Sequence, residues 1–234
     1  MPKVNSLKDD LYVFDNKKLL FKYLSEQILD ISKKSILRKN SFSLVITGGK
    51  TILQLYNILS KTKSNFNKWK IFISDERYLP SYHKDRNDNA IYKVWLNEAK
   101  IPKENINFID TDLGLPEARE NYEKKLNKVK KFDLVLLSIG EDGHIASLFP
   151  NHKYNNIQSV IIERNSPKHP KVRISMSYQR LNNTNNLFKI IIGNKKKSIA
   201  EKLLRKEKIP ANFIKGQKQK IFINKSLLPK KLFD

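Results

Sequence analysis

Several common features are absent from this sequence of 234 residues. It contains no cysteine, which excludes disulfide bonds, thiolate metal sites and cysteine nucleophiles. No apolar run approaches the roughly 20 residues that a membrane-spanning helix needs, and residues 1–5 lack the apolar core of a signal peptide. These absences predict a cytoplasmic protein that is not associated with a membrane.

Acidic residues are scarce relative to basic ones. There are 23 aspartates and glutamates against 46 lysines and arginines, which gives a formal net charge of +23. Such an excess is compatible with nucleic-acid binding. The lysines are nevertheless spread over most segments, many of them on the polar faces of predicted helices such as residues 121–131. We therefore expect no nucleic-acid partner, and we favour a solvated lysine-rich surface that also attracts a small anionic substrate.

Apolar residues follow helical and strand patterns in turn along the chain. The spacing of Leu20, Leu24, Ile28 and Ile31 predicts a helix over residues 17–37. The same criteria predict helices over residues 51–59, 90–96 and 195–204 and from Pro116 onward, and strands over residues 42–46, 69–73, 106–109, 132–139, 157–162, 172–176, 187–192 and 220–223.

The order of these elements indicates the fold class. Because strands alternate with helices through the first 150 residues, we predict an α/β fold of Rossmann-like type. Its central sheet is expected to be mostly parallel, with helices on both faces. No linker, internal repeat or shift in composition divides the chain. A single domain over residues 1–234 is therefore expected.

The first polar cluster follows the strand predicted over residues 42–46. Gly48 and Gly49 let backbone N–H groups close around a phosphate, and the following helix N-terminus adds partial positive charge. Lys50 and Thr51 offer side-chain contacts to the same anion. A nucleoside-triphosphate loop is not expected. Such a loop needs a glycine five positions before its last glycine, and the residue five positions before Gly49 is Leu44. An ordinary strand–turn–helix connection is the alternative.

A second polar cluster, residues 74–80, follows the strand predicted over residues 69–73. Three successive charged residues at the end of a buried strand are unexpected in a core. Arg77 has the planar guanidinium that suits a carboxylate or phosphate. Asp75 is a candidate to accept a sugar hydroxyl or to orient a catalytic group. A surface ion-pair turn is the alternative interpretation.

The third cluster follows the longest predicted strand, residues 132–139. Gly140 and Gly143 permit a tight turn, so that the side chains of Asp142 and His144 can reach one pocket. Histidine has an unperturbed pKa suited to proton transfer near neutral pH, and an acid can fix its tautomer. The spacing leaves open whether Asp142 has that role or binds substrate.

Basic residues further along the chain are candidates for neutralising a phosphate. Lys168 and Arg173 lie at the start of a predicted strand, and Lys196 lies at the start of a predicted helix. In a chain this basic, a solvated side chain is the alternative for any one lysine. The four histidines show no ligand spacing, so no metal site is expected.

Taken together, the three clusters resemble the motifs of the 6-phosphogluconolactonase family. That family carries a Gly-Gly-Ser-Thr-Pro loop, an Asp-Glu-Arg-x-Val-Pro motif and a Gly-x-Gly-x-Asp-Gly-His-x-Ala-Ser-Leu-Phe-Pro motif, in this order. The corresponding segments here are residues 48–52, 75–80 and 138–150. The family's Lys-Pro-Pro-x-x-Arg segment corresponds to residues 168–173, and its late Gly-x-x-Lys to residues 193–196. The third motif is the most specific of them.

The sequence departs from these motifs at a few positions. Lys50 stands in place of a small hydroxyl residue, and Ile52 stands in place of proline. We expect these two changes to alter how the first loop holds an anion. Ser138 replaces the first glycine of the third motif. A Ser-Asn pair that usually follows the second motif is represented by Arg86 and Asn87.

Glucosamine-6-phosphate deaminase shares the fold and the Asp-Gly-His core with this family. It continues with a Phe-Asn-Glu-Pro type sequence, whose glutamate assists ring opening and proton relay. The chain has Ser147-Leu148-Phe149-Pro150 there, with no acid. The resemblance therefore favours lactone hydrolysis. A deaminase-like isomerase and a non-catalytic sugar-phosphate-binding protein on the same fold are the alternatives.

The resemblance implies hydrolysis of 6-phospho-D-glucono-1,5-lactone to 6-phospho-D-gluconate, the second step of the oxidative pentose phosphate pathway. It implies that His144 is the general base and that Asp142 positions it or the substrate. No metal or organic cofactor is expected, because an activated ester needs only a base and charge stabilisation. A monomer or a small homo-oligomer is expected. The expected substrate-binding residues are Gly48, Gly49, Lys50, Thr51, Asp75, Arg77, Lys168, Arg173 and Lys196.

Overall fold

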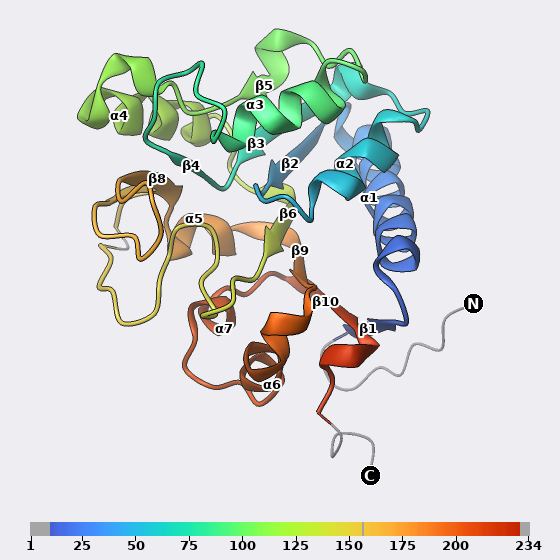
Figure 1. The fold of residues 1–234 in the computed structure, drawn as a ribbon. Coiled ribbons are helices and arrows are strands. Elements are labelled where there is room, and N and C mark those ends of the chain that lie inside the picture. The colour runs from blue at the N-terminus through green and yellow to red at the C-terminus, as the bar shows by residue number, and fades with distance from the viewer. Residues whose placement is uncertain (1–9, 156, 230–234) are drawn as a thin grey trace.

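The computed structural model of the chain describes residues 10–155 and 157–229 (Figure 1). Its strands are β1 (Asp10–Phe14), β2 (Phe42–Ile46), β3 (Trp69–Ile73), β4 (Asp75–Arg77), β5 (Ile106–Asn107), β6 (Phe132–Ser138), β7 (Val160–Glu163), β8 (Arg173–Met176), β9 (Thr184–Ile191) and β10 (Lys218–Asn224). Its α-helices are α1 (Lys17–Lys39), α2 (Leu53–Ser60), α3 (Asn87–Ile91), α4 (Leu115–Asn127), α5 (Tyr178–Asn182), α6 (Lys197–Leu204) and α7 (Pro210–Phe213). No helix in these two ranges has the length and apolar character to cross a membrane.

Seven strands form a parallel central sheet in the order β1-β10-β9-β6-β2-β3-β5. Figure 1 shows α1 and α2 on one side of this sheet and α4 and α5 on the other. The predicted α/β fold, with a mostly parallel sheet between helices, is confirmed. From β2 the chain adds β3 and β5 in one direction, whereas β6, β9 and β10 extend the sheet in the other. The order therefore reverses between β2 and β6, and such a switch point is where open α/β sheets bind their ligands.

A second, antiparallel sheet of three strands has the order β4-β8-β7. Strand β4 follows β3 after a single residue, Ser74, so the chain passes directly from the central sheet into the small one. Pairing places Arg77 opposite Arg173 and Glu163 opposite the same Arg173. The sequence did not predict this sheet, and the segment that it left as a polar cluster, residues 75–77, is a strand.

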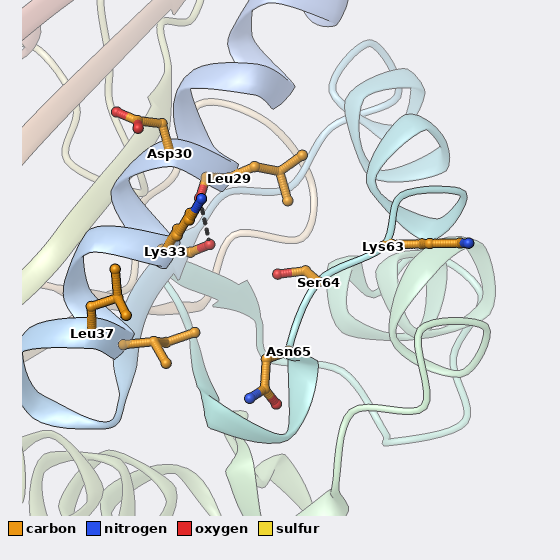
Figure 2. A pocket seen from close by; sticks show the side chains of 9 residues that line it. Leu29, Asp30, Lys33, Leu37, Lys63, Ser64 and Asn65 are labelled. Atoms are coloured by element: carbon orange, nitrogen blue, oxygen red, sulfur yellow. Dashed lines mark hydrogen bonds between the residues drawn. The ribbon is translucent and has the colours of Figure 1, made fainter.

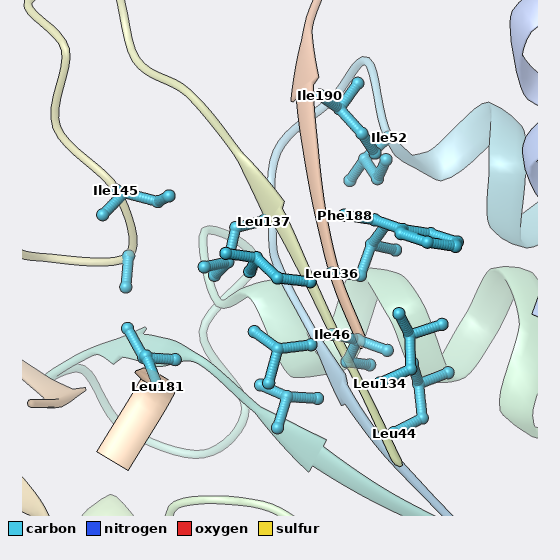
Figure 3. Packing of buried hydrophobic residues seen from close by; sticks show 14 of the residues in the cluster. Leu44, Ile46, Ile52, Leu134, Leu136, Leu137, Ile145, Leu181, Phe188 and Ile190 are labelled. Atoms are coloured by element: carbon cyan, nitrogen blue, oxygen red, sulfur yellow. The ribbon is translucent and has the colours of Figure 1, made fainter. Parts of the chain in front are cut away.

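Apolar residues of the central sheet form the core (Figure 3). Leu44, Leu134 and Phe188 lie on adjacent strands and are at most 1% exposed. Both faces of a parallel sheet are covered, so successive side chains are buried. Complete burial of one such side chain contributes about 1.5–3 kcal/mol. The described core extends from Leu11 to Leu228 as one cluster; a single domain stays a prediction, which this continuity supports.

Two buried tyrosines fix the carboxyl ends of β2 and β3. The hydroxyl of Tyr56, in α2, donates to the Thr47 carbonyl at 2.7 Å and accepts from the Thr47 N–H at 3.2 Å. Tyr122, in α4, binds Ile73 in the same way, at 2.5 Å to the carbonyl and 3.0 Å from the N–H. Burial raises the pKa of both phenols, so they stay protonated donors. These helices thereby hold the two strand ends next to the polar clusters.

Candidate functional site

A pocket with a volume of about 170 Å³ lies at the switch point between β2 and β6. It takes residues from the carboxyl ends of both strands, from β4 and β8 of the small sheet, and from the turn before α6. The central and small sheets therefore build it together. Its lining residues are Thr47, Gly48, Gly49, Asp75, Arg77, Asn87, Ser138, Ile139, Gly140, His144, Ala146, Arg173 and Lys196.

A tight turn after β6 carries His144 into this pocket. The N–H of Gly140 donates to the His144 carbonyl at 2.9 Å, and the N–H of Gly143 donates to the Gly140 carbonyl at 3.2 Å. Gly143 has a φ of 87°, in the left-handed region that glycine adopts without strain. A side chain on Gly140 would overlap the His144 ring. The two glycines of the motif therefore have separate roles, one in the turn and one in making room for the imidazole.

Asp142 fixes the orientation of His144. Its Oδ1 accepts the His144 N–H at 3.1 Å and also contacts Nδ1 of the imidazole. Burial alone would raise the pKa of Asp142, but the hydrogen bond and charge of His144 outweigh it and lower that pKa to about 2. Asp142 is therefore ionised at neutral pH. A carboxylate on Nδ1 leaves Nε2 as the nitrogen that is free to exchange a proton.

Asp75 is buried at the edge of the pocket and is held by two hydroxyl groups. Ser74 Oγ donates to its Oδ1 at 2.8 Å, and Ser147 Oγ donates to its Oδ2 at 2.6 Å. Ser147 belongs to the segment that follows His144, so this bond ties the start of β4 to the loop after β6. Asp75 is 5% exposed, and it presents a preoriented acceptor to the pocket.

Arg77 faces the pocket next to a buried carboxylate. Its guanidinium donates to the Asp85 carbonyl through Nη1. Glu76 is fully buried and accepts the backbone N–H groups of Arg77, Asn87 and Asp88 at 2.8, 2.9 and 2.8 Å. Burial raises the pKa of Glu76, and these three donors oppose that rise. Glu76 thus fixes the backbone at Arg77, Asn87 and Asp88, and it is not among the residues that line the pocket.

Two further cations complete the pocket. Arg173 is 7% exposed; its Nε and Nη2 donate to the carbonyls of Pro170 and Lys168 at 3.3 and 3.2 Å. Lys196 Nζ donates to the Ile139 carbonyl at 2.5 Å. Burial lowers the pKa of both groups. Together with Arg77 they give the pocket an excess of positive charge that suits an anionic ligand.

Most of the residues predicted from the sequence meet at this pocket. Gly48, Gly49, Asp75, Arg77, His144, Arg173 and Lys196 line it, and Asp142 lies behind His144. Lys50, Thr51 and Lys168 are exposed and are not among the lining residues. Their contact with a substrate stays a prediction.

The pocket also contains residues that the sequence did not predict as site residues, namely Thr47, Asn87, Ser138, Ile139, Gly140 and Ala146. Asn87 lies so close to Gly48 that a Cβ there would overlap its amide. Asn87 corresponds to the asparagine of the Ser-Asn pair that usually follows the second family motif, so the resemblance did offer a signal for it. Thr47 directly follows β2 and Ser138 is the last residue of β6. Their place at the carboxyl ends of two central strands was the signal that could have identified them.

Another depression lies between α1 and residues 63–65 (Figure 2). Its side chains are Leu29, Asp30, Ser32, Lys33, Ile36, Leu37, Lys63, Ser64 and Asn65. It has no histidine, and its charged side chains, those of Asp30, Lys33 and Lys63, are all exposed. Within the part of the chain that the structure describes, no three His, Asp or Glu side chains are grouped so that they could hold a metal. The absence of a metal cofactor stays an expectation.

Comparison with known proteins relates the chain to one group of sugar-phosphate enzymes. A family model described as glucosamine-6-phosphate isomerases/6-phosphogluconolactonase matches residues 15–223. The 6-phosphogluconolactonase of Thermotoga maritima is 31% identical over 203 residues, covering 86% of this chain and 91% of that protein. The chloroplastic 6-phosphogluconolactonase 3 of Arabidopsis thaliana is 29% identical over 218 residues, covering 85% of this chain and 67% of that protein.

The solved structures agree with this relationship. The crystal structure of the Thermotoga maritima 6-phosphogluconolactonase matches with a TM-score of 0.86 at 31% identity, covering 92% of this chain and 99% of that one. A monomeric glucosamine-6-phosphate deaminase matches with a TM-score of 0.80 at 18% identity, covering 93% of this chain and 98% of that one. The second likeness shows a shared fold alone.

Proposed function

Because the chain belongs to the family of glucosamine-6-phosphate isomerases and 6-phosphogluconolactonases, we propose that it hydrolyses 6-phospho-D-glucono-1,5-lactone to 6-phospho-D-gluconate, a step of the pentose phosphate pathway. The observation that carries the proposal is the His144–Asp142 pair in one pocket with Arg77, Arg173 and Lys196. Lactone hydrolysis needs a base for water, and the phosphate of the substrate needs cationic partners.

His144 is the general base in this mechanism. Nδ1 is held by Asp142, so Nε2 takes a proton from the water that attacks the C1 carbonyl. The imidazolium then protonates the departing ring oxygen of the lactone, and this transfer returns His144 to its neutral state. The ionised Asp142 stabilises the imidazolium between the two steps. Proton transfer of this kind typically contributes about 10²–10⁴-fold to the rate.

The cationic residues hold the two ends of the substrate. Arg173 and Lys196, with the backbone N–H groups of Gly48 and Gly49, bind the phosphate, and Lys50, Thr51 and Lys168 are expected to add contacts from the exposed rim. Arg77 or nearby N–H groups stabilise the oxyanion that develops on C1. Asp75 accepts a hydroxyl of the sugar. No metal or organic cofactor is needed for these steps.

The composition of the pocket favours hydrolysis over amino-sugar isomerisation. Asp75 is the only carboxylate among the lining residues. Phe149 stands at the position of the glutamate in the deaminase motif. Its ring packs on the His144 ring, with 4.9 Å between the centroids. An apolar ring cannot relay a proton. The pocket thus retains the base and the anion site but lacks an acid for ring opening at this place.

Turnover of the lactone, corrected for its spontaneous hydrolysis, tests the base. We expect His144→Ala to lower kcat by about 10²–10⁴-fold, with correct folding checked by circular dichroism. Activity within a few-fold of the parent would show that His144 is not the base. A parent chain that binds 6-phosphogluconate but does not exceed the uncatalysed rate would instead support the non-catalytic sugar-phosphate-binding alternative.

A second measurement tests the phosphate site. We expect Arg173→Ala and Lys196→Ala to raise KM more than they lower kcat, since they remove ground-state binding. Lys195→Ala is the matched control, because it removes the same charge from an exposed neighbour that does not line the pocket. An unchanged KM in both site variants would mean that the phosphate binds elsewhere.

The proposal extends to location and partners. We infer a single-domain cytoplasmic enzyme that acts as a monomer or small homo-oligomer on a small phosphorylated sugar, without nucleic acid. The cations that face the pocket account for attraction of such a substrate. Steeply salt-dependent binding of nonspecific DNA near physiological salt would contradict the last point, and sedimentation would give the oligomeric state.

A further inference from the structure

A second histidine–carboxylate pair lies outside the pocket. Glu163, at the end of β7, is 4% exposed. Its Oε2 accepts from the Tyr154 hydroxyl at 2.7 Å and contacts His152 Nδ1 at 2.8 Å, and its Oε1 accepts the Asn165 N–H at 2.5 Å. Pairing with Arg173 on β8 fixes its backbone. Glu163 is therefore an immobile anchor, and neither it nor its partners His152 and Tyr154 line the pocket.

The Tyr154 hydroxyl links this anchor to the loop that carries His144. It accepts the backbone N–H of Phe149 at 2.8 Å and lies 3.4 Å from the Ser147 carbonyl. A hydroxyl has one proton to donate, and the 2.7 Å bond to the Glu163 carboxylate uses it. The remaining strong interaction is thus the one with the Phe149 N–H, which sets the backbone at that residue.

Phe149 in turn covers the catalytic imidazole. Phe149 is 2% exposed. Its ring lies 4.9 Å from the His144 ring between centroids, with 43° between the ring planes. The same ring lies 5.9 Å from the Arg173 guanidinium carbon. Asp142 contacts one edge of the imidazole through Nδ1. The tilted Phe149 ring adds a second contact, and the two together restrict rotation of the imidazole more than either does alone.

We propose that Tyr154 and Glu163 are positioning residues that hold the Phe149 ring against His144 and so keep its Nε2 aligned for proton transfer. The proposal rests on the general-base role of His144 proposed above. Small misplacements of a reacting group lower rates by up to about 100-fold. Removing one of these hydrogen bonds leaves the side chains of Asp142 and of the three pocket cations unaltered. We therefore expect a slower chemical step with unchanged substrate binding.

The test compares two tyrosines that lose the same atom. Tyr154→Phe removes the hydroxyl that binds Phe149. Tyr178→Phe is the matched control, because the Tyr178 ring packs on Tyr154 at 6.1 Å but its hydroxyl is not a partner of Glu163 or Phe149. We expect Tyr154→Phe to lower kcat about tenfold with KM within twofold of the parent. Tyr178→Phe is expected to leave both unchanged.

A spectroscopic readout separates positioning from general weakening. The Phe149 ring current shifts the His144 Cδ2 and Cε1 proton resonances, and we expect Tyr154→Phe and Glu163→Gln to move them toward their positions in Phe149→Leu. Combining Tyr154→Phe with Phe149→Leu should lower kcat no further than Phe149→Leu alone, since both act through one contact.

Two results would overturn the proposal: unshifted His144 resonances in Tyr154→Phe, or additive losses of kcat in the double variant. The His144 resonances can be measured in the absence of substrate. If the parent chain shows no lactone hydrolysis, the proposed function fails, while the spectra still decide whether this network positions His144.

Discussion

Gly140 shows how one missing side chain determines the position of the His144 ring. The His144 imidazole occupies the space that a Cβ at residue 140 would need, so the turn after β6 accepts only glycine while the ring is there. The backbone at this residue is otherwise unstrained, because Gly140 is not among the positive-φ residues. The restriction comes from the histidine and not from the turn.

We therefore expect Gly140→Ala to lower lactonase kcat by more than about 100-fold by displacing the imidazole. It should also lower the free energy of unfolding by about 1–3 kcal/mol, the usual cost of overpacking. Urea unfolding and steady-state kinetics measure the two effects. In a His144→Ala background the same substitution should cost almost no stability, and a full loss there would show that the backbone, not the ring, excludes alanine.

Asp142 predicts a pH dependence of stability. Its pKa falls to about 2 in the folded chain, against about 3.9 in an unfolded one, so the folded state favours the carboxylate. The stabilisation is complete above about pH 5 and is lost as the pH falls toward 2. We expect the difference in unfolding free energy between the parent and Asp142→Asn to shrink between pH 5 and pH 3 in urea titrations. A difference that stays constant over this range would contradict the ionised, hydrogen-bonded state of Asp142.

At the residue scale, the sequence predicts the site where neighbours in the chain are neighbours in the pocket. Asp142 and His144 come from one short turn, so their motif predicts the pair. Asn87 is distant in sequence and reaches the pocket only because β3 and β4 bring α3 to Gly48. Lys50 follows the glycines directly, yet the chain turns away after Gly49 and leaves Lys50 exposed.

At the scale of elements, Tyr56 and Tyr122 connect helices α2 and α4 to the ends of strands β2 and β3. Each hydroxyl satisfies both the N–H and the carbonyl of one residue where the parallel ladder ends. Such buried backbone groups need a partner. The two helices thus continue the hydrogen bonding of the sheet at the edge where the pocket opens.

We expect Tyr56→Phe and Tyr122→Phe each to lower the free energy of unfolding by about 1–3 kcal/mol, because two buried backbone groups lose their partner while the ring is kept. Chemical denaturation measures the loss, and Tyr178→Phe serves as the control. A change within experimental error in both variants would show that water replaces the hydroxyl at no cost.

Element prediction succeeded where the burial pattern is simple. Strands β2 and β3 coincide with the predicted ranges 42–46 and 69–73, because each is dominated by buried apolar residues and interrupted by only one polar residue, Ser43 or Lys70. Strand β4 was missed because its three residues are all charged. Its backbone pairs with β8, while Asp75 and Arg77 line the pocket and Glu76 accepts backbone N–H groups. Strand β1 was not predicted either, and the short helices α5 and α7 have too few residues for a helical period to show.

At the scale of the whole molecule, the formal charge of +23 is a source of self-repulsion. Screening by salt weakens repulsion between exposed charges. We expect the Tm to rise by several degrees when NaCl is raised from about 20 to about 300 mM, over which the Debye length falls from roughly 20 to 6 Å. Circular dichroism melting curves measure the shift.

A charge-reduced variant supplies the control for this effect. Lys17, Lys33, Lys61 and Lys128 are exposed and lie outside the pocket. Replacing all four with glutamine should raise the Tm at low salt and reduce its salt response. If salt lowers the Tm of the parent, attractive surface pairs outweigh the net repulsion.

The pocket takes residues from both sheets, with Gly48 and His144 from the central one and Arg77 and Arg173 from the small one. A ligand held between them binds only while the two sheets remain docked, and the unfolded chain offers it no such arrangement. By mass action, an anionic sugar phosphate present at 100 times its Kd adds about 2.7 kcal/mol to the stability of the whole fold. Thermal-shift screening of phosphorylated sugars is therefore a way to rank ligands for this chain without measuring turnover.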